Sequence, residues 1–583
     1  MECYIHTISR IFNNGGNTHY VLPHFQREYI WEKEQWKELL RDLFYVHQEY
    51  EAGKQKIVHF LGLMVIVPDG MISGTIPKSR VVDGQQRLIT ISLILCVLRD
   101  LCKKKKKLKS YALRIETMLI NQYETGYSRF KVLPSSRRED CSVYTTIVDN
   151  HSLGKRPSRI LDAYRYLYRE ISRRISANGI LPEKLYEVLV NCFQVALVIL
   201  NQDNDIESPY KIFESLDGKG KILSQADLVR NYIAMTLPLD LQKQVFEDDW
   251  IKIDEMLQEQ REHGKPGQLT VFLRHYLAMR RNILHPEERV YIRFRDYIEQ
   301  YYQESEAFRQ EISNLRLFAE YYHKLLLPNK EVHEGIQKTL IRLMPLDLSI
   351  SYPFLLANYH ACTNGHITTR EFIHVLEIIE NLLVRRYLCG LSPSILGKWF
   401  AGLWREIEQE QNGNNLVETC QKHIASTKYY PTDRQIRQAI QEVRLYGGKL
   451  PQNRAKITFV LRSIEESLWQ HTDIVAQLKG NSTIEHVMPQ VLTQAWKEEL
   501  GDNWEQVHKD FLHTLGNLTL VTQAKNGQLG NSSFKEKKQL LLSQGLRLNA
   551  YFDHHLPCWD ENAISTRAQW LTQHILTIWP TLV

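Results

Sequence analysis

With 583 residues, the chain is too long for a single hydrophobic core, and its length predicts about three domains. Its 43% hydrophobic and 24% charged residues are ordinary for a soluble globular protein, and no internal repeat or low-complexity tract is evident, which excludes fibrous and disordered classes. The 73 Lys and Arg against 67 Asp and Glu give a net charge of +6, which is compatible with nucleic-acid binding without establishing it.

Cysteine usage and the N-terminal sequence indicate a cytoplasmic protein. The nine cysteines are scattered and form no Cys-x-x-Cys pair, so they favour neither a zinc ribbon nor a disulfide framework. A reducing compartment suits such a chain. The N-terminus lacks the basic and apolar regions of a signal peptide, and the longest apolar stretch, near 88–98, is too short to span a bilayer. We therefore expect no membrane partner.

Strand-like runs are concentrated in the first 240 residues. They lie, in chain order, at residues 58–67, 80–82 and 195–200. A long helical region from about 101 to 189 separates the last two runs, and Ser224 is expected to cap a helix that closes the segment. These patterns predict an α/β domain with a helical insertion over residues 1–240.

One strand-to-helix turn in this domain has the composition of an anion-binding site. It runs from Asp83 to Arg87 through Gly84, Gln85 and Gln86, between a β-branched run and apolar residues at helical spacing. Free amide groups and the helix dipole at such a turn attract anions, Gly84 permits close approach, and Arg87 offers a planar fork to phosphate. In the alternative, Asp83 is only a helix N-cap and Arg87 only a surface charge.

The sequence from 241 to 425 is predicted to be almost entirely helical. Apolar residues recur three and four apart at 272–276, 315–327 and 372–387, as in stacked helices. Several tyrosines and arginines here are better explained as core-edge or helix-surface residues than as the lining of a nucleic-acid channel. They are Tyr291, Arg293, Tyr297, Arg385, Arg386 and Tyr387. The lysine run Lys103 to Lys107 fits a solvated surface and a phosphate-contacting patch equally well.

Residues 484–526 have the arrangement of a metal-dependent phosphodiesterase site. His486 is predicted to end a strand, Asn517 to precede a second strand, and Asn526 to open a lysine-rich helix. A neutral imidazole can take a proton from water, and the oxygens of Glu485 and Asn526 suit Mg²⁺ or Mn²⁺. We therefore predict His486 as general base, Asn517 as the residue that steadies its loop, and Glu485 with Asn526 as metal ligands.

Two neighbours of Asn526 leave alternatives open. Asn531 is expected to flank the same helix start and is an alternative metal ligand, and Lys525 is a further candidate for stabilising charge in the transition state.

Together these segments resemble the GmrSD-type modification-dependent (type IV) restriction endonucleases. The C-terminal half is similar to the family pattern Glu-His-x-x-Pro, Gly-Asn-Leu-Thr-Leu and Asn, and the N-terminal half contains its Asp-Gly-Gln-Gln-Arg box. Three companion segments occur in the family order at 23–31, 59–62 and 212–231. One departure is Asp217, where the family commonly has asparagine.

The resemblance implies a multidomain α+β protein with three parts. They are a ParB-like nucleotide-binding and DNA-sensing domain (1–240), a helical linker (241–425) and an HNH-like ββα-metal nuclease domain (426–583). It assigns nucleoside triphosphate binding and hydrolysis to one set of residues: Asp83, Gly84, Gln85, Gln86 and Arg87, with Gln26 and Arg27.

The implied activity is NTP-dependent or NTP-regulated cleavage of modified foreign DNA, base-modified or phosphorothioated, in antiviral defence. A homodimer is compatible with it. The alternatives are a nucleotide-gated nucleic-acid-binding protein with an inactive nuclease half, and an RNA-cleaving toxin-like nuclease.

Overall fold

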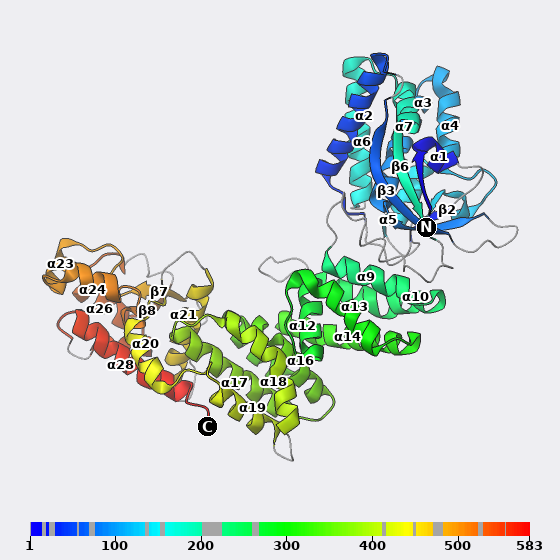
Figure 1. Ribbon diagram of the computed structural model, residues 1–583. Coiled ribbons are helices and arrows are strands. Elements are labelled where there is room, and N and C mark those ends of the chain that lie inside the picture. Colours follow the sequence, from blue (N-terminus) through cyan, green and yellow to red (C-terminus); the bar gives the residue numbers. More distant parts are fainter. Residues whose placement is uncertain are drawn as a thin grey trace. The chain divides into compact units, whose positions relative to one another are not determined.

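The computed structural model divides the chain into two compact units, Met1–Ile251 with Arg295–Gln310, and Lys252–Phe294 with Glu311–Val583 (Figure 1). The structure describes residues 2–13, 19–22, 29–54, 57–68, 76–133, 139–151, 158–200, 224–258, 268–410, 415–446, 451–469, 482–522, 529–553 and 556–583. The protein is a mostly helical, multidomain α+β chain with its larger sheet near the N-terminus. The three expected segments, 1–240, 241–425 and 426–583, stay a prediction.

The first unit is built on a six-stranded mixed sheet with the order β1-β6-β3-β4-β2-β5. Its strands are β1 (Glu2–Thr7), β2 (His19–Val21), β3 (His59–Pro68), β4 (Lys78–Asp83), β5 (Val132–Leu133) and β6 (Phe193–Ile199). The three predicted strands are confirmed as β3, β4 and β6. The sequence did not indicate β1, an edge strand with an exposed face, or the very short β2 and β5, which show no alternation of apolar residues.

Helix α3 is the centre of this unit's core. It packs against α4, α6 and α7, and its residues from Leu88 to Leu98 are buried on every side. The helices around the sheet are α1 (Ile8–Asn13), α2 (Lys33–Glu51), α3 (Gln85–Lys103), α4 (Lys109–Leu119), α5 (Glu139–Val148), α6 (Arg159–Asn178) and α7 (Pro182–Cys192) (Figure 1). The predicted helical insertion between β4 and β6 is therefore confirmed.

Ser224 caps helix α9 (Gln225–Thr236), as predicted. Its hydroxyl accepts a hydrogen bond from the Asp227 amide, and the Asp227 carboxylate accepts one from the Ser224 amide. The lysine run is exposed at the end of α3, where buried Leu108 anchors the turn that follows, and Lys104 lies 5.1 Å from the ring of Tyr168.

The second unit contains the predicted helices of the middle segment. They include α12 (Leu269–Arg281), α14 (Ser305–Leu326, which begins in the first unit), α15 (Glu334–Leu343), α16 (Tyr352–Thr363), α17 (Thr369–Leu388), α18 (Leu396–Glu410) and α19 (Leu416–Ser426). Among the described residues no single helix is long and apolar enough to cross a membrane, although the bent pair Glu334–Leu346 and Leu348–Thr363 passes that test together.

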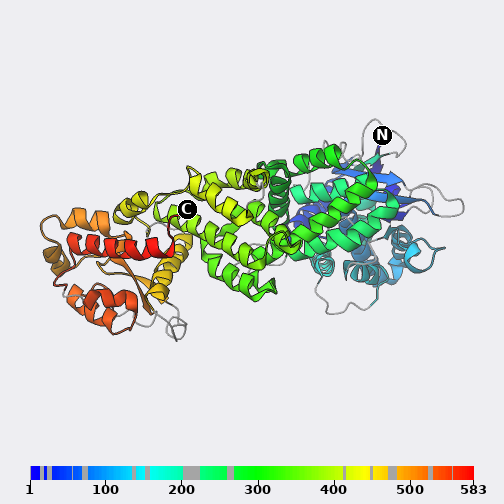
Figure 2. The ribbon, with the colours of Figure 1, turned by 90° about the horizontal axis from the view of Figure 1, so that it is seen from below.

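The C-terminal part of the second unit contains a two-stranded antiparallel sheet, β7 (Ser482–His486) with β8 (Leu518–Thr522). The helices around it include α20 (Asp433–Glu442), α21 (Pro451–Leu468), α23 (Gln494–Leu500), α24 (Trp504–Phe511), α26 (Phe534–Leu542) and α28 (Glu561–Ile578). Helix α28, red in Figure 2, packs against α20 and α21. The predicted order of two strands followed by a lysine-rich helix is confirmed.

The start of that helix differs from the expectation. Helix α26 begins at Phe534, because Ser533 and Glu536 form a reciprocal capping box there. The prediction that Asn526 opens the helix is therefore wrong, and Asn526 itself lies outside the described residues.

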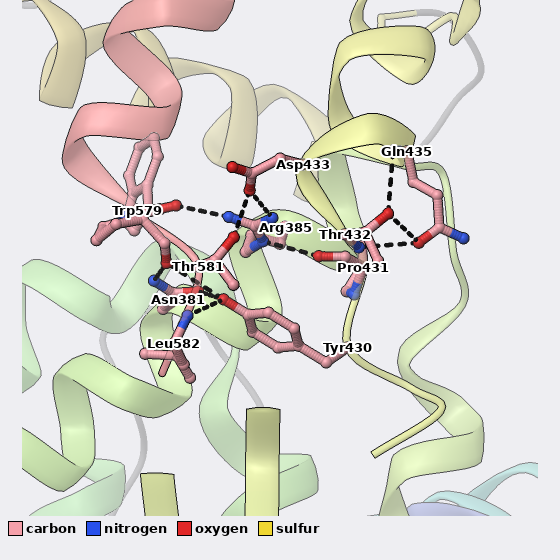
Figure 3. A network of polar contacts seen from close by, with 11 residues as sticks. Asn381, Arg385, Tyr430, Pro431, Thr432, Asp433, Gln435, Trp579, Thr581 and Leu582 are labelled. Atoms are coloured by element: carbon pink, nitrogen blue, oxygen red, sulfur yellow. Dashed lines mark hydrogen bonds and ion pairs between the residues drawn. The ribbon is translucent and has the colours of Figure 1, made fainter. Parts of the chain in front are cut away.

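Arg385 ties α17 to the last residues of the chain (Figure 3). Its guanidinium is fully buried and donates to the Pro431 carbonyl (3.0 Å) and the Trp579 carbonyl (2.8 Å), and it is paired with Asp433. One turn earlier, the Asn381 amide donates to the Pro580 carbonyl at 2.8 Å.

Neighbouring Arg386 also donates to backbone carbonyls, and Tyr291 and Tyr297 are buried. For these residues the favoured interpretation, core rather than nucleic-acid channel, is confirmed.

We predict that Arg385→Ala lowers the free energy of unfolding of the second unit by at least about 2 kcal/mol, because it removes charged hydrogen bonds to buried carbonyls. Urea denaturation measures the change. Arg370→Ala, at an exposed position on the same helix, is the control and should change stability by less than about 0.5 kcal/mol. Equal effects of the two substitutions would show that the Arg385 network contributes nothing.

Candidate functional site

A strand-to-helix turn lies at the end of strand β4. The strand ends at Asp83, Gly84 takes the left-handed conformation at φ +94° as N-cap, and α3 begins at Gln85. The alternative in which Asp83 is the N-cap is therefore wrong. Gln85, Gln86 and Arg87 belong to the first helical turn, not to the loop before it.

Arg87 is anchored by the neighbouring strand β3. Its Nη1 donates to the Leu61 carbonyl at 2.7 Å, and its Nη2 lies 3.3 Å from the Asp83 carboxylate. Gly62, at φ +103°, leaves the necessary space, since a Cβ there would lie 2.3 Å from Nη1. Burial lowers the pKa of Arg87 and the Asp83 carboxylate opposes that shift, so the guanidinium stays charged. The segment 59–62 thus has a direct role in placing Arg87.

Gln86 connects the turn to the segment before α2. Its side-chain oxygen accepts a hydrogen bond from the Ile30 amide at 2.9 Å, and both Gln85 and Gln86 are buried. Nearby, the Tyr29 hydroxyl is hydrogen-bonded to Thr90 at 2.7 Å. The structure therefore brings the end of segment 23–31 against the first turns of α3.

Other predicted members of this site cannot be placed. Gln26, Arg27 and Asp217 lie outside the described residues. The described part of the site is a guanidinium 19% exposed and a carboxylate 42% exposed at the start of a long helix, an arrangement able to hold a phosphate group.

In the second unit, His486 and Glu485 are the last two residues of β7. His486 pairs with Leu518 and Glu485 with Thr519. Consecutive side chains of a strand point to opposite faces. Glu485 turns toward α26, where its Oε1 accepts from the fully buried Lys537 ammonium at 2.6 Å, and the same ammonium donates to the His486 carbonyl at 2.8 Å.

Burial acts on both members of this ion pair. It raises the pKa of Glu485 and lowers the pKa of Lys537, while the attraction between the two charges opposes both shifts. Lys537 thereby fixes the end of β7 from one face.

Asn517 fixes the chain that follows His486. Its Oδ1 accepts from the Met488 amide (2.7 Å) and the Trp559 indole (3.0 Å), and its Nδ2 donates to the carbonyls of Met488 and Leu512 (both 3.0 Å). A primary amide has two acceptor sites and two donors, so this fully buried side chain uses all of them. Its backbone carbonyl also accepts from the Val487 amide at 3.0 Å.

His486 is only 5% exposed and lies among other rings. Its Nε2 is 3.2 Å from Nδ1 of His513, and the ring of Tyr446 meets it edge to face at 4.6 Å. Burial lowers the pKa of His486 to about 3, and positive charge on His513, Lys537 and His508 acts in the same direction. The imidazole is therefore neutral at neutral pH.

Among the expected metal ligands, Glu485 lies near the end of β7. Asn526 and Lys525 lie outside the described residues, and Asn531 is exposed just before the cap of α26. Within the described ranges, no group of three or more His, Cys, Asp or Glu side chains is placed to hold a metal ion. Of the expected pair Glu485 and Asn526, Glu485 is the one that the structure describes.

Sequence reasoning missed the partners of His486. His513, Tyr446 and Lys537 come from segments distant in the chain, and none carries a local pattern that distinguishes it. The lysine-rich helix was expected from the sequence, but its composition did not indicate that Lys537 would be fully buried.

Comparison with protein families matches both halves of the chain. A profile described as the N-terminal domain of the GmrSD restriction endonuclease matches residues 8–234, and one described as the C-terminal domain of GmrSD restriction endonucleases matches residues 430–574. No curated protein matches the chain.

We predict that Gly62→Ala destabilises the first unit more than Gly53→Ala does. Both glycines have positive φ, so both substitutions cost about 1–2 kcal/mol in backbone strain. Only the Cβ at position 62 collides with Arg87, whereas nothing lies within 4 Å of a Cβ at position 53. Thermal denaturation compares the two, and equal losses would mean that the guanidinium moves aside without cost.

We predict that Asn517→Ala lowers the free energy of unfolding by at least about 3 kcal/mol, because several buried backbone groups lose their partners. Asn517→Asp should be at least as harmful, since a carboxylate cannot donate to the carbonyls of Met488 and Leu512. Asn562→Ala, at an exposed position on α28, is the control for urea denaturation. A fully stable Asn517→Asp variant would contradict the assignment of these hydrogen bonds.

Proposed function

This chain belongs to the GmrSD-type restriction endonuclease family, with the N-terminal and C-terminal domains of that family in one polypeptide, and on that premise we propose that it is a nucleotide-regulated nuclease that cuts modified foreign DNA. A restriction endonuclease acts on DNA. The observation that carries the proposal is the two-stranded sheet of the second unit, where a neutral histidine ends β7 and Asn517 holds the chain that follows it.

In the proposed reaction His486 is the general base. Its neutral ring accepts a proton from water as the water oxygen attacks the phosphorus of a phosphodiester, and the bond to the leaving oxygen breaks. The nearby Lys537 does not face the imidazole, because it is bound to Glu485 and to the His486 carbonyl. Asn517 holds the backbone after His486 and so limits movement of the base.

Glu485 and Asn526 would hold Mg²⁺ or Mn²⁺, with Asn531 as the alternative to Asn526. Carboxylate and amide oxygens are the donors that these cations prefer, so the donor type fits. One Glu485 oxygen is engaged by Lys537, and a cation would bind at the other. When bound, the cation stabilises negative charge on the phosphate. We propose an HNH-like ββα-metal fold for this domain on the same grounds.

In the first unit we propose that the ParB-like domain binds and hydrolyses a nucleoside triphosphate at Asp83–Arg87. The start of α3 supplies amide groups, and Arg87 supplies a cation whose position is fixed by Leu61. Gln26 and Arg27 would complete the site. Nucleotide state and base-modified or phosphorothioated DNA together would set nuclease activity in the cytoplasm, as befits a defence enzyme that must spare host DNA.

We predict that His486→Ala reduces cleavage of modified plasmid DNA by about 10²–10⁴-fold, because it removes the proton acceptor. Nucleotide hydrolysis should persist. His374→Ala, an exposed histidine of α17, is the matched control. Chelation of divalent cations should abolish cleavage by the unmodified protein, and cleavage by His486→Ala within about tenfold of the unmodified protein would reject the assignment.

We predict that Asp83→Ala and Arg87→Ala abolish nucleotide turnover and alter the ratio of cleavage of modified to unmodified plasmid. Arg41→Ala, on the exposed face of α2, should do neither. Phosphate release and plasmid cleavage are measured on the same preparations. Unchanged turnover in Arg87→Ala would show that the turn has only a structural role.

A further inference from the structure

Both ring nitrogens of His486 face a side chain. Nδ1 lies 3.4 Å from the amide nitrogen of Gln490, and Nε2 lies 3.2 Å from Nδ1 of His513. An amide nitrogen can only donate a hydrogen bond, so Nδ1 of His486 presents its lone pair to Gln490. A neutral imidazole carries one proton, which therefore resides on Nε2 and is donated to His513.

The geometry points to His513 as a positioning residue for the nuclease reaction, one that fixes the tautomer and the ring orientation of His486 so that Nδ1 is the basic atom. This inference rests on the proposed role of His486 as general base. His513 accepts a hydrogen bond from Nε2 of His486 at its own Nδ1 and carries its own proton on Nε2.

His513 is itself held in place. Its backbone carbonyl accepts from the amides of Leu445 (2.9 Å) and Tyr446 (3.2 Å). The ring of Tyr446 is stacked on His513 at 5.9 Å and meets His486 edge to face, and the Tyr446 hydroxyl accepts from Arg454 at 3.0 Å. The Tyr446 ring and the hydrogen bond to the fixed His513 therefore restrict rotation of the His486 ring.

The opposite side of His486 is different. Gln490 is exposed, and its contact with Nδ1 is long for a hydrogen bond. A water molecule bound for attack on a phosphate can replace this weak partner at Nδ1, whereas the Nε2 side is closed by His513 and Tyr446. Nδ1 is therefore the nitrogen that can accept a proton from water, and Nε2 is the nitrogen that orients the ring.

A neutral acceptor has an advantage here. In many hydrolases a carboxylate orients the histidine base, but a carboxylate would place negative charge close to an incoming phosphodiester. A histidine accepts the same hydrogen bond without that charge. The His486–His513 pair therefore suits a polyanionic substrate.

The test compares His513→Leu with His513→Asn in the full chain. Leucine removes the acceptor, whereas an asparagine Oδ1 can take approximately the place of the histidine Nδ1 and accept from His486. We expect His513→Leu to lower kcat on plasmid DNA by about 10–100-fold with KM unchanged, and His513→Asn to restore most of that loss. His374→Leu is the control, and thermal melting is measured for every variant.

A double-mutant cycle supplies a readout that packing alone would not move. In the His486→Ala background, His513→Leu should cause no further loss, because the base through which it acts is already absent. Independent, additive losses would overturn the inference. So would equal kcat values for the leucine and asparagine variants, or a kcat for His513→Leu within about threefold of the unmodified protein.

The outcome separates this inference from the proposed function. If His486→Ala is inactive while both His513 variants are fully active, only the positioning role fails. If His486→Ala itself cleaves DNA normally, the proposed function fails.

Discussion

The site around His486 depends on the hydrogen bonds of the buried Asn517 side-chain amide. Strand β7 ends at His486, and the described pairing between β7 and β8 does not continue beyond that residue. Asn517, just before strand β8, takes the place of further strand pairing, because its side chain forms hydrogen bonds with both the amide and the carbonyl of Met488. Its own place is fixed from α28, where Arg567 donates to the carbonyls of Gly516 and Leu518 on either side of it. His486 is thus positioned by a chain of contacts that leads to helix α28.

Both candidate sites hold a cation against a backbone carbonyl oxygen. Arg87 rests on the Leu61 carbonyl, and Lys537 on the His486 carbonyl, each with one carboxylate nearby. Lys537 is fully buried and is costly to move, because no solvent is available to replace it beside the His486 carbonyl. Each cation fixes a helix to a strand end: α3 to β3 in the first unit, and α26 to β7 in the second.

The sequence predicted the parts of the fold that follow a local pattern. Strands β3, β4, β6, β7 and β8, and the cap of α9, were recognised from apolar alternation and capping residues. Helix α26 was recognised, but not its start, because an asparagine was preferred over the Ser533 box. The position of His486 at a strand end was predicted from its own segment. His513 and Tyr446 were not, because only tertiary folding brings residues 446, 486 and 513 together.

The hydrogen bonds of Arg385 join helix α17 to residues 431 and 579, which lie in a different predicted segment of the chain. Side chains of α17 donate to the carbonyls of residues 431, 579 and 580, so we expect α17 and the residues that follow α28 to unfold together. A fragment beginning at residue 426 would leave those buried carbonyls without their donors and would expose Trp579, which is 2% accessible in the full chain. The backbone amides of α17 and α28 should accordingly lose their protection from hydrogen exchange together. Proteolytic cleavage within one helix should make the other susceptible to cleavage.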